Sequence, residues 1–263
     1  MAPTNFDRQE VQLFIEKTIG CAGPENLKEN REAFLNFKVT TSNIATLEKL
    51  VEHDATCLFE KGIQSCLQGV EDLLKGYEAW AIVKLYYASY YLLRCKLAMS
   101  DISIIRNQQI YTLNIKRDSK PKKFRLNSDH KATIALFKRE FEGVDIFSTQ
   151  SIDDNYPFDW LASMREWVNY RARNFPEPFN KTYFYQTSIL SIEEQISIYL
   201  GDTTPHYCFD SDYACLALPI KHAQLTAKQF YGEGRTLTPP FKKFFKKRLA
   251  PKNIPTNLSF LCP

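Results

Sequence analysis

The stretch "YEAWAIVKLYYASYYLLRCKLAMS", residues 77–100, is the densest apolar run of the chain and decides the fold class. Only Glu78 and Lys84 carry a charge before Arg94. The run is far too long for a single β-strand. A helix that is apolar on nearly every side is buried among other elements. We therefore expect a central helix with further helices packed around it.

Upstream of this run, apolar residues again recur at helical spacing. They do so from residue 42 to residue 74, which predicts a helix that is either continuous or broken near Asp54. A shorter helix is predicted over residues 7–19. Asp7 is a suitable N-cap for it, and Gly20 stands where such a helix would end.

The composition changes between residues 102 and 126. The segments "ISIIR", "IYTLNI" and "KKFRL" are rich in β-branched and aromatic residues, and "KRDSKPK" lies between the last two. This pattern predicts a β-hairpin, or three short strands, inserted between helices. The connection carries no Asn-Gly or Asp-Gly signal, so a loose turn is expected.

Helical patterns return after the insertion. They cover four segments, at residues 128–141, about 157–174, 191–202 and 207–230. The chain is thus predicted to be mainly all-α, a helical bundle with a small inserted β-hairpin at about 102–126 and a C-terminal helical extension. Its expected parts are an N-terminal helix and connector (1–40), the bundle with its insertion (41–202), and the extension with a basic tail (203–263).

Composition limits the class of protein. The chain has 263 residues, of which 44% are hydrophobic and 14% aromatic, enough for a sizeable core. Its formal net charge is only +4, so the distribution of charge matters more than the total. The start of the chain does not resemble a signal peptide, and no apolar run reaches the length of a membrane span. A cytoplasmic protein is expected.

Cysteine and histidine usage argues against disulfides and metals. The seven cysteines include no CxxC pair, which favours a reducing compartment. The four histidines show no ligand spacing beside cysteine pairs. The sequence also has no glycine-rich phosphate loop and no GxSxG motif. We expect neither a metal nor another cofactor.

One predicted helix carries an unusual set of polar residues. In "MREWVNYRARNF", residues 164–175, Arg165, Asn169 and Arg173 are four apart and share a face, with Tyr170 close by. Fixed positive charge with hydrogen-bonding groups suits a phosphate. The other interpretation is that these residues are only the solvated side of a surface helix.

Three stretches, taken in order, resemble the HEPN domain (higher eukaryotes and prokaryotes nucleotide-binding). The stretch "LYYASYYLLRCKLAMSD" is similar to a HEPN core helix with paired tyrosines. The stretch "DHKATIALFKREF" resembles the element that follows it in small prokaryotic HEPN families. The third, "MREWVNYRARNF", is similar to their arginine-containing last core helix. The resemblance covers about residues 55–200.

This resemblance implies a HEPN-like bundle that binds RNA or cleaves it without a metal, in a prokaryotic anti-phage defence or toxin system. Active HEPN ribonucleases carry a His four to six residues after the Arg, and they cleave RNA in a cleft between two copies of the domain. The resemblance therefore implies a homodimer or pseudo-dimer. Here Arg165 matches, while Asn169 and Tyr170 match a variant subset that lacks this His. The implied catalytic residues are these three. The alternative is a non-catalytic subunit of a defence complex that binds a partner protein or nucleic acid.

Further basic residues are candidates for nucleic-acid contact. Some follow Arg165 and others lie in or near the hairpin: Arg171, Arg173, Lys116, Arg117, Lys120, Lys122, Lys123, Arg125 and His130. The plain alternative for the hairpin is a solvated edge whose lysines prevent aggregation.

The C-terminal segment "PPFKKFFKKRL", residues 239–249, has a basic amphipathic pattern. Its phenylalanines and Leu249 are expected to face one way and its lysines the other. It could lie on nucleic acid, on an anionic membrane or against a partner, or dock on the bundle through its phenylalanines.

Overall fold

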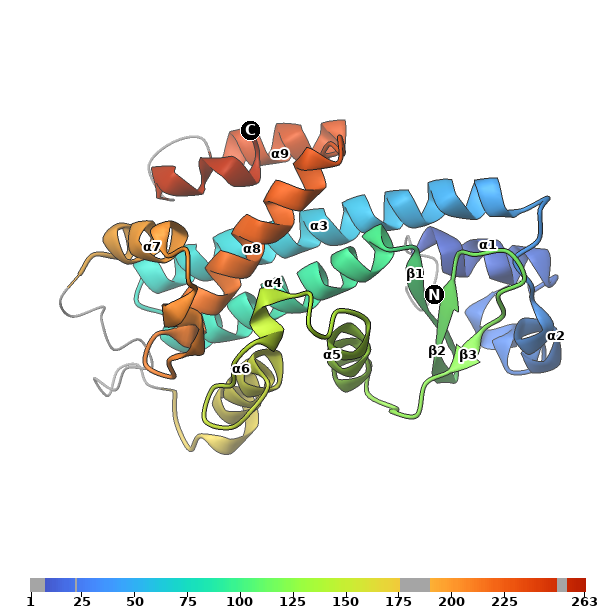
Figure 1. Ribbon diagram of the computed structural model, residues 1–263, viewed down its shortest axis with the longest axis horizontal. Helices are drawn as coiled ribbons and strands as arrows, with labels where there is room; N and C mark the ends of the chain where they lie inside the picture. The colour runs from blue at the N-terminus through green and yellow to red at the C-terminus, as the bar shows by residue number, and fades with distance from the viewer. Residues whose placement is uncertain (1–7, 22, 176–189, 250–254) are drawn as a thin grey trace. The chain divides into compact units, whose positions relative to one another are not determined.

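A computed structural model describes residues 8–21, 23–175, 190–249 and 255–263 (Figure 1). This part of the chain is mainly helical and contains one three-stranded antiparallel sheet, so the predicted fold class is confirmed. The chain divides into two compact units. The first comprises residues 1–58 and 93–137, and the second comprises residues 59–92 and 138–263.

The two longest helices contribute residues to both units. Helix α3 spans Ile44–Leu74 without a break, and α4 spans Glu78–Met99. Within the second unit they approach closely at glycine. A Cβ atom added at Gly62 of α3 would lie 2.7 Å from the side chain of Leu92 in α4. That distance is shorter than real contacts, so a larger residue here would force the side chain of Leu92 or the helices to shift.

The first unit is built around the inserted sheet. Strands β1 (Ile102–Asn107) and β2 (Gln109–Asn114) pair antiparallel, and the two-residue β3 (Lys122–Lys123) pairs with β2. The β1–β2 turn is tight rather than loose. It needs a positive φ of 58° at Gln108, a conformation that glycine or asparagine usually signals. The other elements of this unit are α1 (Glu10–Thr18), η1 (Pro24–Leu27), α2 (Arg31–Asn36) and the start of α5 (Asp129–Glu140).

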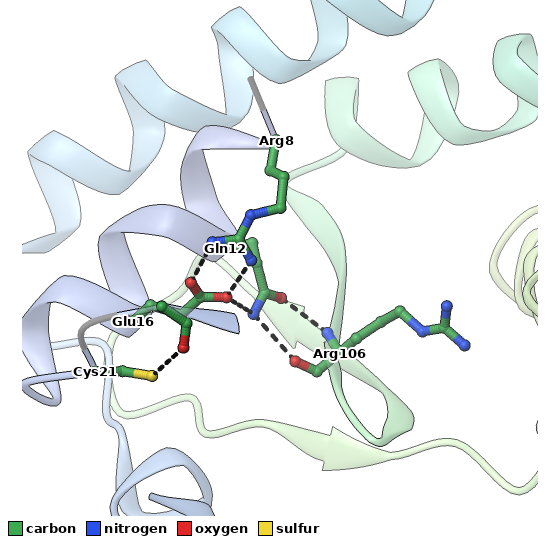
Figure 2. Close-up of polar contacts among 6 residues, drawn as sticks. Arg8, Gln12, Glu16, Cys21 and Arg106 are labelled. Atoms are coloured by element: carbon green, nitrogen blue, oxygen red, sulfur yellow. Dashed lines mark hydrogen bonds and ion pairs between the residues drawn. The ribbon is translucent and has the colours of Figure 1, made fainter. Parts of the chain in front are cut away.

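A polar network fixes α1 to β1 (Figure 2). The side-chain amide of Gln12 pairs with the backbone of Arg106, donating to its carbonyl at 3.0 Å and accepting from its N–H at 2.8 Å. Gln12 also donates to the carboxylate of Glu16, which is buried. Arg8 closes the network with two hydrogen bonds to that carboxylate, at 2.7 and 2.5 Å. Because both charges of this pair are matched, Glu16 tolerates burial.

Asp54 in the middle of α3 caps a different helix. Its carboxylate accepts the backbone N–H groups of Glu10 and Val11 at 2.7 and 3.2 Å, in the first turn of α1. Free N–H groups at a helix start attract such an acceptor. Asp54 is the residue near which the sequence allowed a break in the helix. Its polar side chain is explained by this contact with α1.

Asp54→Asn is expected to change how stability depends on pH. Burial raises the pKa of the Asp54 carboxyl above its ordinary value of 3.8, although the two N–H donors lower it. The folded state then binds more protons than the unfolded state just above pH 3.8, so the free energy of unfolding falls as pH rises through this window. Asparagine cannot titrate and should remove that fall. Urea denaturation of both proteins at pH values from about 3.5 to 7 measures it; equal slopes would contradict the assignment.

The second unit packs helices on the N-terminal half of α4 and the C-terminal half of α3. Phe59 of α3 stacks on Phe230 of α8 with ring centroids 4.1 Å apart. A capping box at Ser191 and Glu194 starts α7. The elements of this unit are η2 (Ile146–Ser148), α6 (Pro157–Glu166), η3 (Trp167–Arg171), α7 (Ile192–Gly201), η5 (His206–Phe209), α8 (Ala214–Gly232), α9 (Pro239–Leu249) and η6 (Thr256–Leu261).

Two expected boundaries are corrected in this unit. The helix expected at about 157–174 is α-helical only to Glu166 and continues as the π-helix η3. The helix expected over 207–230 begins as the short η5, and α8 starts only at Ala214. None of the helices in the described ranges has the length and apolarity needed to cross a membrane.

Candidate nucleic-acid interface

The π-helix η3 brings two of the predicted site residues together. It is closed by a hydrogen bond from the N–H of Ala172 to the carbonyl of Trp167, at 2.8 Å. Residues five apart are offset by about 140° around an α-helix, but a π-turn reduces that offset. The guanidinium carbon of Arg165 accordingly lies 5.7 Å from the ring centroid of Tyr170. Single π-turns of this kind occur frequently at functional sites.

Arg165 is held by aromatic rings and not by an acid. Its guanidinium carbon lies 5.6 Å from the ring centroid of Tyr86 and 5.7 Å from that of Tyr87, both on α4. One Nη atom donates a long hydrogen bond of 3.4 Å to the Tyr87 hydroxyl. The Nε atom is buried and has no hydrogen-bond partner. Among the described residues no carboxylate pairs with this arginine.

The side chain of Tyr86 does not neutralise this charge. Burial raises the pKa of Tyr86, while the charge of Arg165 lowers it to a smaller extent. Tyr86 therefore keeps its proton at neutral pH and offers only the face of a neutral ring. A part-buried guanidinium without a counter-ion retains its attraction for an incoming anion.

Exposed aromatic rings lie beside Arg165 and on the helix that carries its tyrosine contacts. Trp80 is 50% exposed and contacts Phe175 edge-on, with ring centroids 5.9 Å apart. Tyr170 is 72% exposed. We call Trp80, Tyr87, Arg165, Tyr170 and Phe175 the Arg165 surface. It combines one cation with ring faces that solvent can reach.

Sequence reasoning missed the α4 side of this surface. The run from residue 77 to 100 was expected to be buried on nearly all sides, yet Trp80, Lys84, Tyr87 and Tyr91 form a partly exposed stripe. Their spacing of four, three and four residues was the signal that could have found it. The stripe stays open because Trp, Tyr and Lys combine an apolar body with a polar tip.

The other predicted residues of this segment play smaller parts. Asn169 is partly buried, and it forms no hydrogen bond with Arg165 in the described part of the chain. Arg171 forms an ion pair with Glu166 at 2.9 Å, which offsets much of its charge. Arg173 is exposed. Of the arginines in this stretch, Arg165 is the one that the fold places against tyrosines.

The basic residues of the insertion belong to the first unit, separate from the unit that holds Arg165. Arg117 lies 3.9 Å from Asp118, whose carboxylate also pairs with Lys38 at 2.7 Å. His130 is partly buried in the first turn of α5. The remaining predicted cations are exposed: Lys116, Lys120, Lys122, Lys123 and Arg125. Such exposure suits phosphate contact and a solvated hairpin equally.

No family model, curated protein or solved structure matches this chain. Any ligand of the Arg165 surface has to be inferred from the chemistry of its own residues. Within the described ranges, no cluster of three or more His, Cys, Asp or Glu side chains has the arrangement to hold a metal ion. The chemistry offered at the Arg165 surface is that of an anion-binding guanidinium and stacking rings.

Proposed function

We propose that this chain binds single-stranded RNA at the Arg165 surface. One observation carries the proposal: a part-buried guanidinium has tyrosine rings around it and no carboxylate partner among the residues that the structure describes. Proteins that bind single strands combine positive charge for the backbone with aromatic side chains for the bases. The Arg165 surface supplies both within one unit.

Each part of a single strand has a suitable partner here. The guanidinium of Arg165 would donate hydrogen bonds to phosphate oxygens. The exposed rings of Trp80 and Tyr170 would stack on bases, at about 1–3 kcal/mol per base. Bases inside a duplex are already stacked, so exposed rings favour an unpaired strand. The resemblance to HEPN domains supports RNA as the class of nucleic acid.

The exposed cations of the insertion would offer the first unit its own contacts with nucleic acid, and these contacts would not depend on sequence. Each lysine or arginine that meets a phosphate releases condensed counter-ions, which makes binding weaken as salt rises. These residues would therefore strengthen binding without choosing between single and double strands. The choice would come from the Arg165 surface.

Fluorescence anisotropy with a labelled RNA of about 12 unpaired nucleotides tests the proposal against the same RNA annealed to its complement. We expect the single strand to bind at least about tenfold more tightly, because the duplex loses the stacking. The variant Lys28→Glu/Lys49→Glu changes two exposed lysines of the first unit. It shows how much of the affinity for RNA depends on the net charge of the protein alone. Equal affinity for strand and duplex, or no binding at all, would contradict the proposal.

A second candidate function is metal-independent cleavage of the bound RNA. It is favoured by η3, which sets the exposed Tyr170 beside Arg165. In such cleavage the 2′-oxygen attacks the adjacent phosphorus and the 5′-oxygen of the next nucleotide leaves with a proton. The products are a 2′,3′-cyclic phosphate and a 5′-hydroxyl.

Incubation with EDTA, followed by a denaturing gel, would show these termini for the wild-type protein and not for Arg165→Ala. Intact RNA with the wild-type protein would rule out this second candidate.

A further inference from the structure

Helix α9 is docked on the second unit and keeps a basic face. The N–H of Thr238, just before the helix, donates to the carboxylate of Glu60 in α3 at 2.6 Å. Leu237 and Phe245 are buried. Phe244, expected to point inward with the other phenylalanines, is instead 40% exposed. The side chain of Leu249 lies outside the described residues.

Four lysines lie on one side of α9: Lys243, Lys246 and Lys247, which are exposed, and Lys242, which is partly buried. The helix contains no acidic residue, and none of the four lysines has an ion-pair partner among the described residues. Because an α-helix has about 3.6 residues per turn, these four positions lie on one side of the helix within about two turns. The result is a row of ammonium groups with Phe244 at its edge.

This basic row is not an extension of the Arg165 surface. Figure 1 shows α6 beside the N-terminal half of α8 and α9 beyond the opposite end of α8. Both helices belong to the second unit. The lysine row is therefore a surface distinct from the Arg165 surface.

We propose that the lysine face of α9 binds the surface of a lipid bilayer that contains anionic phospholipids. The face is the outward side of a helix, which presents its charges to a broad surface. Its cations are lysines, which act as compact point charges and do not form the planar fork that arginine offers a single phosphate. A dense array of anionic headgroups suits such charges, and the exposed ring of Phe244 suits the boundary between headgroups and acyl chains.

The expected strength follows from the number of lysines. Each lysine near an anionic membrane surface strengthens binding about fivefold. Loss of Lys243 and Lys247, both exposed, should thus weaken binding at least about 20-fold. Phe244→Ser should weaken it severalfold with no change of charge.

Co-sedimentation of the full chain with vesicles tests the proposal. The vesicles are phosphatidylcholine alone, or phosphatidylcholine with about 30 mol% phosphatidylserine. We expect binding only to the anionic vesicles, and its loss at high salt. The variant Lys243→Glu/Lys247→Glu should lose binding. Lys28→Glu/Lys49→Glu, with the same change of charge elsewhere, should keep it. Unfolding midpoints in urea confirm that each variant is folded.

Three outcomes would overturn the proposal. They are equal binding to both vesicle types, an equal loss in both double variants, and undiminished binding of Lys243→Glu/Lys247→Glu. A loss of RNA binding by that variant, without vesicle binding by the wild-type protein, would assign α9 to RNA instead. RNA binding at the Arg165 surface is measured separately, so either proposal can fail without the other.

Discussion

Replacing Arg165 by alanine is expected to lower the affinity for single-stranded RNA by roughly 30- to 150-fold, or about 2–3 kcal/mol. A hydrogen bond to a charged group contributes more than a neutral one, and in the described part of the chain no carboxylate would have to be displaced from this guanidinium first. Anisotropy titration with the unpaired RNA measures the loss. The slope of log K against log salt should also become smaller by about one, because one phosphate contact is lost.

Controls separate a role in binding from a role in folding. Arg31→Ala removes an exposed arginine at the start of α2, in the other unit, and should leave the affinity within about twofold. Arg165→Lys keeps the charge but loses the planar fork, so an intermediate affinity is expected. An Arg165→Ala protein that is folded and still binds RNA like the wild-type protein would refute the assignment. A large loss of stability would indicate that the arginine mainly holds the tyrosines in place.

The fold class could be predicted because its signals are local. The apolar run that became α4 is too long for a strand, and the β-branched segments that became β1 and β2 alternate with turn residues. Both patterns depend on residues close together in the chain. The continuity of α3 through Asp54 could not be predicted in this way. The partners of Asp54 are two N–H groups more than 40 positions earlier in the chain, which local patterns do not reveal.

The candidate site was predictable only on one of its two sides. The motif around Arg165 and Tyr170 is visible in the sequence, whereas Trp80 and Tyr87 were hidden inside an apolar run. A helix buried on most sides differs little in sequence from one buried on all sides. The π-turn of η3 has no sequence signature of its own, yet it decides where Tyr170 lies relative to Arg165.

Replacing Phe59 by alanine is expected to have the largest effect on stability. The ring is fully buried in α3, stacks on Phe230 and meets Tyr231 edge-on with centroids 5.7 Å apart. Truncation removes the buried apolar surface and leaves a cavity between α3 and α8. Changes of this kind lower the free energy of unfolding by about 3–5 kcal/mol. Urea denaturation followed by circular dichroism measures it.

The matched control is Phe244→Ala, the same truncation at an exposed ring of α9, which should cost less than about 1 kcal/mol. A similar loss in both variants would mean that the α3–α8 contact is not the source of stability.

Glu60, next to Phe59, also accepts a hydrogen bond from the Thr238 N–H, just before α9. This turn of α3 therefore holds both α8 and α9. Phe59 does not belong to the Arg165 surface. Under conditions where Phe59→Ala remains folded, the variant should therefore bind RNA with wild-type affinity. Its α9 should be attached less stably to α3, because Glu60 stands next to the truncated side chain.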